Sequence, residues 1–469
     1  MKKFLIFLAV ILTLFVAVFV LALANLNRYQ PFFERRLSEA LGRPVKLGML
    51  SLGWNGGPVF GTESLSLPPV EFRHLSILVK NPGWSRPVDF KGSTQFISDH
   101  SNLNFNGRVT LDAKGKGGTL DHFHLESDLK ELSRPKLKEA WPELFKELDL
   151  ARPFRGNLTL NAGPLALDAE GAKTASVSVR LEAGQVALER LKNPIQGIDL
   201  DAALGARELR VNSFDAELAG GKIEGRGAIK RSDVHALSLE FTAENLTLQD
   251  LVQGSPDKPQ LMGKLFAGFK GASQAPSAEG LLQNISGSGR IVLKDPVVIR
   301  LNILRELLSH LAKLPGMAET LQNSLPPYYQ LKLQETHTAL QTVDLPFVVR
   351  SGAFQFDDLK IGTGEFLLAG QGRVTLDGQV GIQAWVILNA QLSAILISGV
   401  GEAAYFADSL GQIQIPVRIE GPLDKLQFKP DKDYIAKKVA VNKGQELLSD
   451  LLSKKDGSSA KGFLSKLIK

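Results

Sequence analysis

Three short stretches of the chain contain residue types that carry out chemistry in enzymes. The run Asp121-His122-Phe123-His124 places two imidazoles on one side of an extended strand, as in a pair of metal ligands. Gly399 and Gly401, followed by Ala404 and about twenty residues later by Glu420, have the spacing of a dinucleotide-binding turn. The run KGKGGT around Gly115 has the glycine and lysine content of a phosphate-binding loop.

Each of the three patterns lacks a part that its chemistry requires. No third metal ligand follows the histidine pair nearby, and the run around Gly115 has no Gly-Lys-Ser/Thr ending. A dinucleotide fold needs several further parallel strands, but only about fifty lysine-rich residues follow Glu420. No Gly-x-Ser-x-Gly elbow or paired carboxylates stand out. We therefore expect no enzymatic activity, no catalytic or metal-binding residue and no cofactor.

Composition narrows the class of protein further. The 469 residues are 44% hydrophobic and 22% charged, which is a globular balance. The absence of cysteine excludes disulfides, zinc thiolate sites and cysteine nucleophiles. The net charge of +6 is spread along the chain, and lysines gather mainly after Asp431, so we expect no nucleic-acid partner.

The N-terminal segment predicts a membrane anchor. The run from Phe4 through Leu14 to Ala24 contains no charge, and at about 1.5 Å per residue it is long enough to cross a hydrocarbon core of roughly 30 Å. A cleaved signal peptide is the alternative, because Ala22-Leu23-Ala24 has the form of a cleavage site. The run exceeds the usual apolar region of about 7 to 15 residues in such peptides, which favours an uncleaved anchor.

The hexamer GRVTLD occurs twice, beginning at Gly107 and at Gly372. Its apolar valine and leucine alternate with polar residues, which is the period of a strand with one buried face, and the glycine predicts a turn that starts the strand. Looser copies begin at Gly156, Gly227 and Gly289. Their irregular spacing indicates a repeated hairpin unit with insertions rather than a strict solenoid.

The whole pattern predicts a mostly β fold, an elongated antiparallel groove of repeated hairpins. Helical periodicity is confined mainly to residues 31–42, 136–148 and 301–314, too few to cover so much sheet. The apolar side of the strands must then be buried by curling of the sheet or by something that is not protein. The candidate inward residues are Val109, Leu111, Leu158, Leu160, Ile229, Ile291, Leu293, Val374 and Leu376. The same residues also fit the core of a closed β-sandwich.

Both ends of the chain resemble AsmA family proteins. At the N-terminus the resemblance is carried by the apolar segment followed by PFFERRLSEALGRPV and KLGMLSLGW, and near the C-terminus by SGAFQFDDLKIGTGEFLLAGQGRVTLDGQV and IPVRIEGPLDKLQFKPD. The middle of the chain shares only the strand rhythm. This chain departs from the family in its modest length and in the apolar stretch LSAILISGVGEAAYF.

The resemblance implies a single-pass inner-membrane protein whose bulk is periplasmic and whose β-groove carries phospholipid toward the outer membrane or acts in outer-membrane assembly. A lipid chain of about 16 methylenes costs on the order of 13 kcal/mol to expose to water, so such a carrier needs a continuous apolar surface. A non-transporting envelope scaffold with a closed sandwich body is the alternative. The expected regions are an anchor (1–27), a helix with the first strands (28–92), a β-groove body (93–290), an AsmA-like β region with a helical insertion (291–431) and a basic tail (432–469).

The tail has the pattern of an amphipathic basic element. Apolar residues recur at helical spacing beside lysines, and the expected docking residues are Leu447, Leu451, Phe463, Leu467, Lys454 and Lys455. We expect this element to dock on an outer-membrane protein or on an anionic membrane surface. The alternative is a helix that caps the last strand, followed by a solvated tail.

Overall fold

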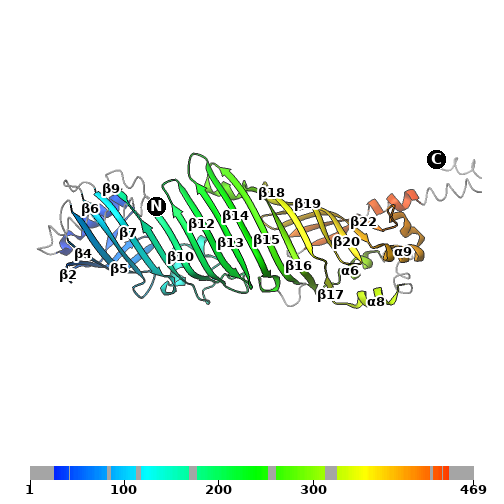
Figure 1. Ribbon diagram of the computed structural model, residues 1–469, viewed down its shortest axis with the longest axis horizontal. Helices are drawn as coiled ribbons and strands as arrows, with labels where there is room; N and C mark the ends of the chain where they lie inside the picture. Colours follow the sequence, from blue (N-terminus) through cyan, green and yellow to red (C-terminus); the bar gives the residue numbers. More distant parts are fainter. Residues whose placement is uncertain are drawn as a thin grey trace, which may run out of the picture. The chain divides into compact units, whose positions relative to one another are not determined.

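The structure is a computed structural model that describes residues 26–41, 43–81, 86–111, 118–167, 177–251, 260–311, 325–422, 426–431, 433–435 and 437–442. The strands β1 to β23 of these residues belong to one antiparallel sheet (Figure 1). The prediction of a mostly β, antiparallel fold built from repeated hairpins is thereby confirmed. The chain divides into two compact units, unit 1 (residues 1–253 and 268–284) and unit 2 (254–267 and 285–469).

Unit 1 is built almost entirely of sheet. Its strands are β1 (Lys46–Leu47), β2 (Leu50–Trp54), β3 (Pro58–Leu67), β4 (Val70–Lys80), β5 (Pro87–Phe96), β6 (Leu103–Leu111), β7 (Gly118–Asp128), β8 (Arg155–Ala162), β9 (Leu165–Leu167), β10 (Val177–Val186), β11 (Ile195–Leu204), β12 (Glu208–Leu218), β13 (Gly221–Lys230), β14 (His235–Thr247) and the second part of β15 (Gln260–Ala275). From β3 to β14 neighbours in sequence pair antiparallel, except that β8 and β9 both pair with β7 and β8 then pairs with β10. β1 and β2 likewise share β3 as their partner. β1 and β2 are therefore two parts of one interrupted strand, and so are β8 and β9.

The helices of unit 1 are short and lie at its strand ends. They are η1 (Leu26–Tyr29), α2 (Gln30–Leu41), η2 (Leu129–Glu131), α3 (Arg134–Ala140), α4 (Pro142–Phe145), η3 (Leu248–Asp250) and α5 (Ala278–Gln283). α2 confirms the helix predicted from residue 31. The helix predicted for residues 136–148 is divided between α3 and α4, because Pro142 has no N–H with which to continue α3.

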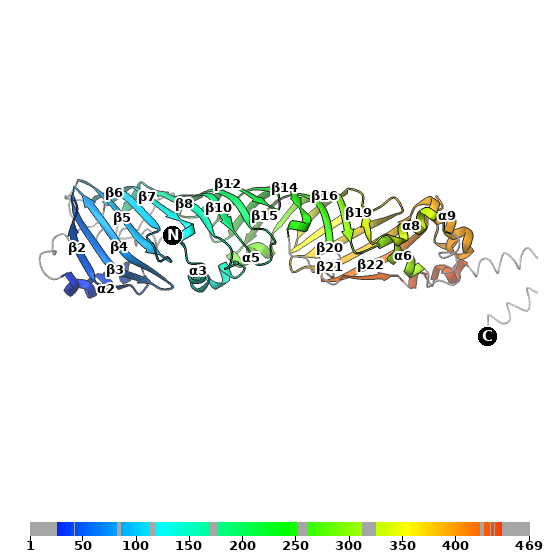
Figure 2. The same ribbon diagram turned by 90° about the horizontal axis from the view of Figure 1, so that it is seen from below.

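Unit 2 combines sheet with a helical layer. Its strands are the first part of β15, β16 (Ser286–Ile299), β17 (His337–Ala339), β18 (Val343–Arg350), β19 (Ala353–Gly362), β20 (Phe366–Thr375), β21 (Gln379–Leu388), β22 (Gln414–Pro422) and β23 (Gln427–Pro430). Its helices are α6 (Ile303–Leu311), α8 (Pro327–Gln334), α9 (Ala390–Gly399) and η4 (Gly401–Phe406). Figures 1 and 2 show α6, α8 and α9 beside β20 to β22.

The strand-like run of the dinucleotide pattern proved to be a helix. Asn389 accepts a hydrogen bond from the backbone N–H of Leu392 at 2.7 Å and so caps the start of α9. Gly399 is the last residue of α9 and Gly401 begins η4, so the strand that should precede this glycine turn is absent from the described chain.

The glycine of the repeated hexamer does not start a strand, contrary to the sequence prediction. Gly107 and Gly372 lie inside β6 and β20, and both copies of the hexamer run into the end of a strand. A Cβ on Gly107 would lie 2.5 Å from Cζ of Phe90, and one on Gly372 would lie 2.7 Å from Cγ1 of Ile382. Glycine is needed there because a large side chain of the neighbouring strand crosses its backbone. Of the looser copies, only Gly156 lies next to the first residue of its strand.

Two groups of predicted residues lie outside the described residues. They are the anchor residues Phe4, Leu14 and Ala24 and the tail residues Leu447, Leu451, Phe463, Leu467, Lys454 and Lys455. Within the described chain, no helix is both long and apolar enough to span a bilayer. The described start of the tail packs on unit 2, since Tyr434, Ile435 and Val439 contact its hydrophobic core.

Candidate functional site

Three rows of apolar side chains cross unit 1 from β8 to β14 on one side of the sheet. Alternate residues of a strand point to the same side, so residues in register across the strands form continuous rows. The first row is Leu158, Leu181, Leu200, Phe214, Gly225 and Phe241, the second is Leu160, Val179, Ala202, Val211, Gly227 and Leu239, and the third is Ala162, Val177, Leu204, Leu209, Ile229 and Leu237. The rows make one face of the sheet apolar across six neighbouring strands.

The opposite side of the same strands is polar and is held together by ion pairs. Arg180 lies 3.2 Å from Asp201, and Arg226 lies 2.8 Å from Glu240, each pair joining two neighbouring strands. Hydrogen bonds from Asn212 and Arg180 lower the pKa of Asp201, and the hydrogen bond from Arg226 lowers the pKa of Glu240. The carboxylates are therefore charged at neutral pH, and they direct this side of the sheet toward water.

Burial of the apolar side changes along unit 1. In β5 to β7 the side chains of Phe90, Phe105 and Phe123 are buried, with ring centroids 6.3 to 6.4 Å apart. From β11 to β14 the larger apolar side chains of the three rows are only half-buried or exposed, and Phe241 is 37% exposed, whereas Ala202 of the second row is buried, as are Leu218 and Leu246 near the strand ends. We call this stretch the open apolar face, which consists of Leu200, Leu204, Leu209, Val211, Phe214, Ile223, Ile229, Leu237, Leu239 and Phe241.

Among the described residues of unit 1, Leu204 of the open apolar face packs against the cluster of β5 to β7, and α5 contacts β14. None of the four buried hydrophobic clusters of the described chain contains a residue of β12, β13 or β14. A contiguous apolar surface of this kind marks a place where an apolar ligand, a membrane or another protein binds. Apolar side chains of this kind bind a partner by exclusion of water.

Unit 2 shows how the same strand pattern is covered. Its largest core cluster joins Ala384, Val386 and Leu388 of β21 and Ile415 and Val417 of β22 to the helices. The helical residues in this core include Leu304, Leu308, Tyr329, Leu392 and Leu396. Over these strands the apolar side of the sheet is therefore a closed interior.

The nine predicted groove residues fall into different environments. Ile229 belongs to the open apolar face, and Leu158 and Leu160 are half-buried in the rows that lead to it. Val109 is buried in the aromatic cluster of β5 to β7. Ile291, Leu293 and Val374 are half-buried in unit 2, where Ile291 faces Leu345 and Val374 faces Val380 in register.

Two of the nine do not fit the prediction of an inward strand position. Leu376 is 52% exposed and follows the last residue of β20, at the start of the turn that the bond from the N–H of Gly378 to the carbonyl of Thr375 closes. Leu111 ends β6, and its side chain lies outside the described residues. The prediction missed Leu200, Phe214 and Leu239, although the alternation in LRVNSFDAELAGG and LSLEFTAEN was the signal for two of them.

The histidine pair is part of the polar side of the sheet. Nδ1 of His124 lies 2.7 Å from Oδ1 of Asn161, and Nε2 lies 2.8 Å from Oε1 of Glu126. These two hydrogen bonds raise the pKa of His124. No group of three or more potential metal ligands occurs in the described part of the chain.

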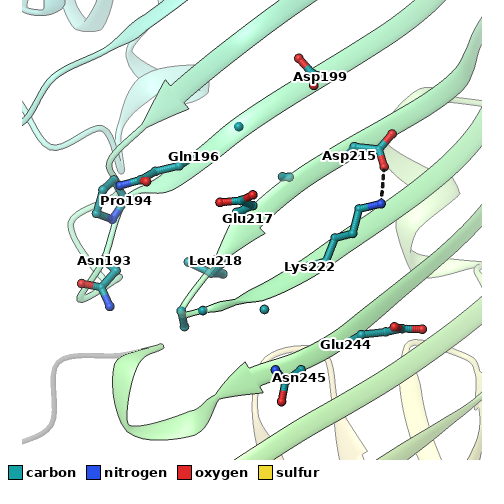
Figure 3. A pocket seen from close by; sticks show the side chains of 15 residues that line it. Asn193, Pro194, Gln196, Asp199, Asp215, Glu217, Leu218, Lys222, Glu244 and Asn245 are labelled. Carbon is teal, nitrogen blue, oxygen red and sulfur yellow. Dashed lines mark ion pairs between the residues drawn. The ribbon is translucent and has the colours of Figure 1, made fainter.

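An acidic hollow lies where β11 to β14 end, shown in Figure 3. Its volume is about 840 Å³, and Asp199, Asp215, Glu217 and Glu244 line it together with Lys222. Nζ of Lys222 lies 3.1 Å from Oδ1 of Asp215. The carboxylates belong to the polar side of the strands, so the hollow is separate from the open apolar face.

Comparisons of the chain with protein-family models, with characterised proteins and with solved structures found no match. The open apolar face is therefore the feature from which we infer a function.

Proposed function

We propose that the open apolar face binds the acyl chains of phospholipid, and that the protein belongs with the AsmA-type envelope proteins that its ends resemble. In this proposal Phe4 to Ala24 anchor the chain in the inner membrane, the body is periplasmic, and the protein acts in phospholipid transport to the outer membrane or in outer-membrane assembly. The observation that supports it is the set of apolar rows that remain half-exposed from β11 to β14.

The dimensions and chemistry of the face suit an acyl chain. The open apolar face crosses the four strands β11 to β14, and strands about 4.8 Å apart make it about 14 Å wide. This width is close to the half of a hydrocarbon core of roughly 30 Å that one leaflet of a bilayer contributes. Apolar attraction is non-directional, so a chain can slide along the rows without breaking a specific contact.

A closed scaffold is the competing function. The helical cover of β20 to β22 is the observation that favours it, because it shows that this chain can cover its own sheet. A scaffold would have the open apolar face occupied by protein rather than by lipid.

Photo-crosslinking of the full chain in its native membrane distinguishes the two. A photoreactive amino acid at Leu239 samples the open apolar face, and one at Arg226 samples the polar side of the neighbouring strand. We expect phospholipid adducts at Leu239 and none at Arg226. Exclusively protein adducts at Leu239 would support the scaffold.

A substitution on the same row gives an independent readout. Leu239→Asp places a charge on the half-exposed face, which excludes acyl chains without leaving a charge in a closed core. We expect co-purifying phospholipid to fall while the circular dichroism spectrum is unchanged. Unchanged lipid content in this variant would contradict binding at this face.

A further inference from the structure

A second apolar surface lies at the edge of the unit 1 sheet that β2 forms. Met49, Leu52 and Trp54 are 60%, 44% and 77% exposed, and two of them belong to β2. In the described chain β2 pairs only with β3, so it is an edge strand. Exposed tryptophan and leucine on an edge strand are an association hazard unless something covers them.

The apolar residues of β2 continue an interior cluster out to the surface. Leu50, Leu52 and Trp54 alternate along the strand and point to the same side. Leu50 packs against the cluster of Phe33, Leu37, Val45, Leu47 and Leu65, whereas Leu52 and Trp54 extend beyond it. Leu52 is in register with Phe60, which packs on the same cluster.

Cationic side chains lie on and beside α2, and η1 just before α2 contacts β2. The exposed cations of α2 and the residues near it are Arg28, Arg35, Arg36, Arg43 and Lys46. Glu34 is turned inward, since its Oε1 accepts the N–H of Leu47 at 2.8 Å, and Glu39 lies 3.6 Å from Arg36. Glu63 is an exposed anion beside Met49, whose carbonyl accepts its N–H at 3.1 Å, and the five cations exceed Glu39 and Glu63, so the outward charge here is positive.

The segment predicted to be the anchor ends beside the same strand. It ends at Ala24, and the described chain begins at Leu26, the first residue of η1. Oδ1 of Asn27 accepts the N–H of Leu50 at 2.8 Å, which fixes this start of the chain at β2. A membrane that held residues 4–24 would lie near Leu50, and Leu52 and Trp54 are two and four residues farther along the same strand.

We propose that Met49, Leu52 and Trp54, together with the cations on and beside α2, form a docking surface that inserts into the interface of an anionic bilayer. Tryptophan prefers the interfacial region of a membrane, and arginine and lysine are attracted to anionic headgroups. The inference rests on the membrane anchor of the proposed function but not on lipid binding at the open apolar face.

A second copy of the chain suits this surface less well. A symmetric contact would place the same cations of two copies against each other, and like charges repel across an interface. An anionic membrane neutralises them instead.

The test uses nitroxide labels, because the chain has no cysteine to give background labelling. Full-length Leu52→Cys is labelled and reconstituted in vesicles of phosphatidylglycerol and phosphatidylethanolamine. Val234→Cys is the matched control, since Val234 is 49% exposed and lies between β13 and β14, away from the apolar edge. Leu14→Cys reports whether the anchor is in the bilayer.

We expect collisions of the Leu52 label with a water-soluble relaxation agent to fall at least about threefold on reconstitution, as for an interfacial site, with no change at Val234. A Leu52 label as accessible to water as the Val234 label, with the Leu14 label in lipid, would overturn the docking surface and leave the anchor intact. A Leu14 label in water would overturn both. Spin-spin broadening between Leu52 labels would assign the surface to a second copy instead.

Discussion

The apolar side of the sheet is covered by helices over β20 to β22 but is half-exposed over β11 to β14. Over β20 to β22 it meets α6, α8 and α9, and Leu388, Leu392 and Leu396 have no exposed surface. Over β11 to β14 the same alternation leaves leucines and phenylalanines half-exposed. A strand pattern thus specifies an apolar side, and a separate element decides whether that side becomes a core or a binding surface.

The region from β5 to β7 shows a third outcome. There the sheet has aromatic side chains at Phe90, Phe105 and Phe123, and glycines at Gly92 and Gly107 make room for them. A Cβ on Gly92 would lie 2.2 Å from Cζ of Phe105. Aromatic side chains therefore fill this part of the apolar side without a covering helix.

The largest expected effect separates the covered strands from the open ones. Leu396→Ala removes a side chain with no exposed surface from the core of unit 2, and we expect a loss of about 2 to 5 kcal/mol in the free energy of unfolding. Leu239→Ala removes a half-exposed side chain, and we expect a loss of about 1 kcal/mol or less. Urea unfolding of the full chain in mild detergent measures both. Equal losses would mean that the open apolar face is packed like a core.

A smaller effect separates the aromatic region from the open one. A Cβ at Gly107 would lie 2.7 Å from the backbone oxygen of His122, so we expect Gly107→Ala to cost about 1 to 3 kcal/mol. At Gly225 the nearest atom would be 3.4 Å away, so we expect Gly225→Ala to be neutral or to stabilise by about 0.4 to 1 kcal/mol. Thermal unfolding of the two variants compares them. A large loss at Gly225 would show that the open strands are as tightly packed as the aromatic ones.

The smallest expected effect concerns the attachment of the helical cover at alkaline pH. The hydroxyl of Tyr328 in α8 donates to Glu365, just before β20, and this hydrogen bond raises the pKa of Tyr328 to about 12 from the ordinary 10.0. A raised folded-state pKa favours the neutral phenol, so its contribution to stability is complete below pH 10 and is lost as the pH rises through about 12. Because Tyr328 is 52% exposed, we expect only a slight loss.

Absorbance titration of tyrosinate checks this attachment. We expect a late transition in the wild type whose amplitude falls in Tyr328→Phe. A Tyr29→Phe control should retain the late transition. An unchanged titration in Tyr328→Phe would show that the bond to Glu365 does not hold α8 in place.

Local patterns in the sequence predicted most of the strands because their determinants are local. Val-x-Leu alternation in GRVTLD placed Val109 and Val374 on the apolar side of β6 and β20, where the register confirms them. The same alternation did not identify Gly107 as an interior residue, because the reason for the glycine is the ring of Phe90 on another strand. Alternation also failed to predict α9. Its run AILISG is apolar throughout, so it fits a strand or a helix equally well, and the cap at Asn389 is what starts a helix there.

The sequence by itself determined that this chain forms an antiparallel sheet with one apolar and one charged side, since the alternation of apolar and charged residues along a strand is a property of neighbouring residues. Only the tertiary structure decided which part of the apolar side is a core. Ile229 in β13 and Val386 in β21 both lie on the apolar side of their strands, yet Val386 is covered by helices while Ile229 stays half-exposed. The difference arises from contacts between segments far apart in the chain, and hydrophobic periodicity carries no information about such contacts.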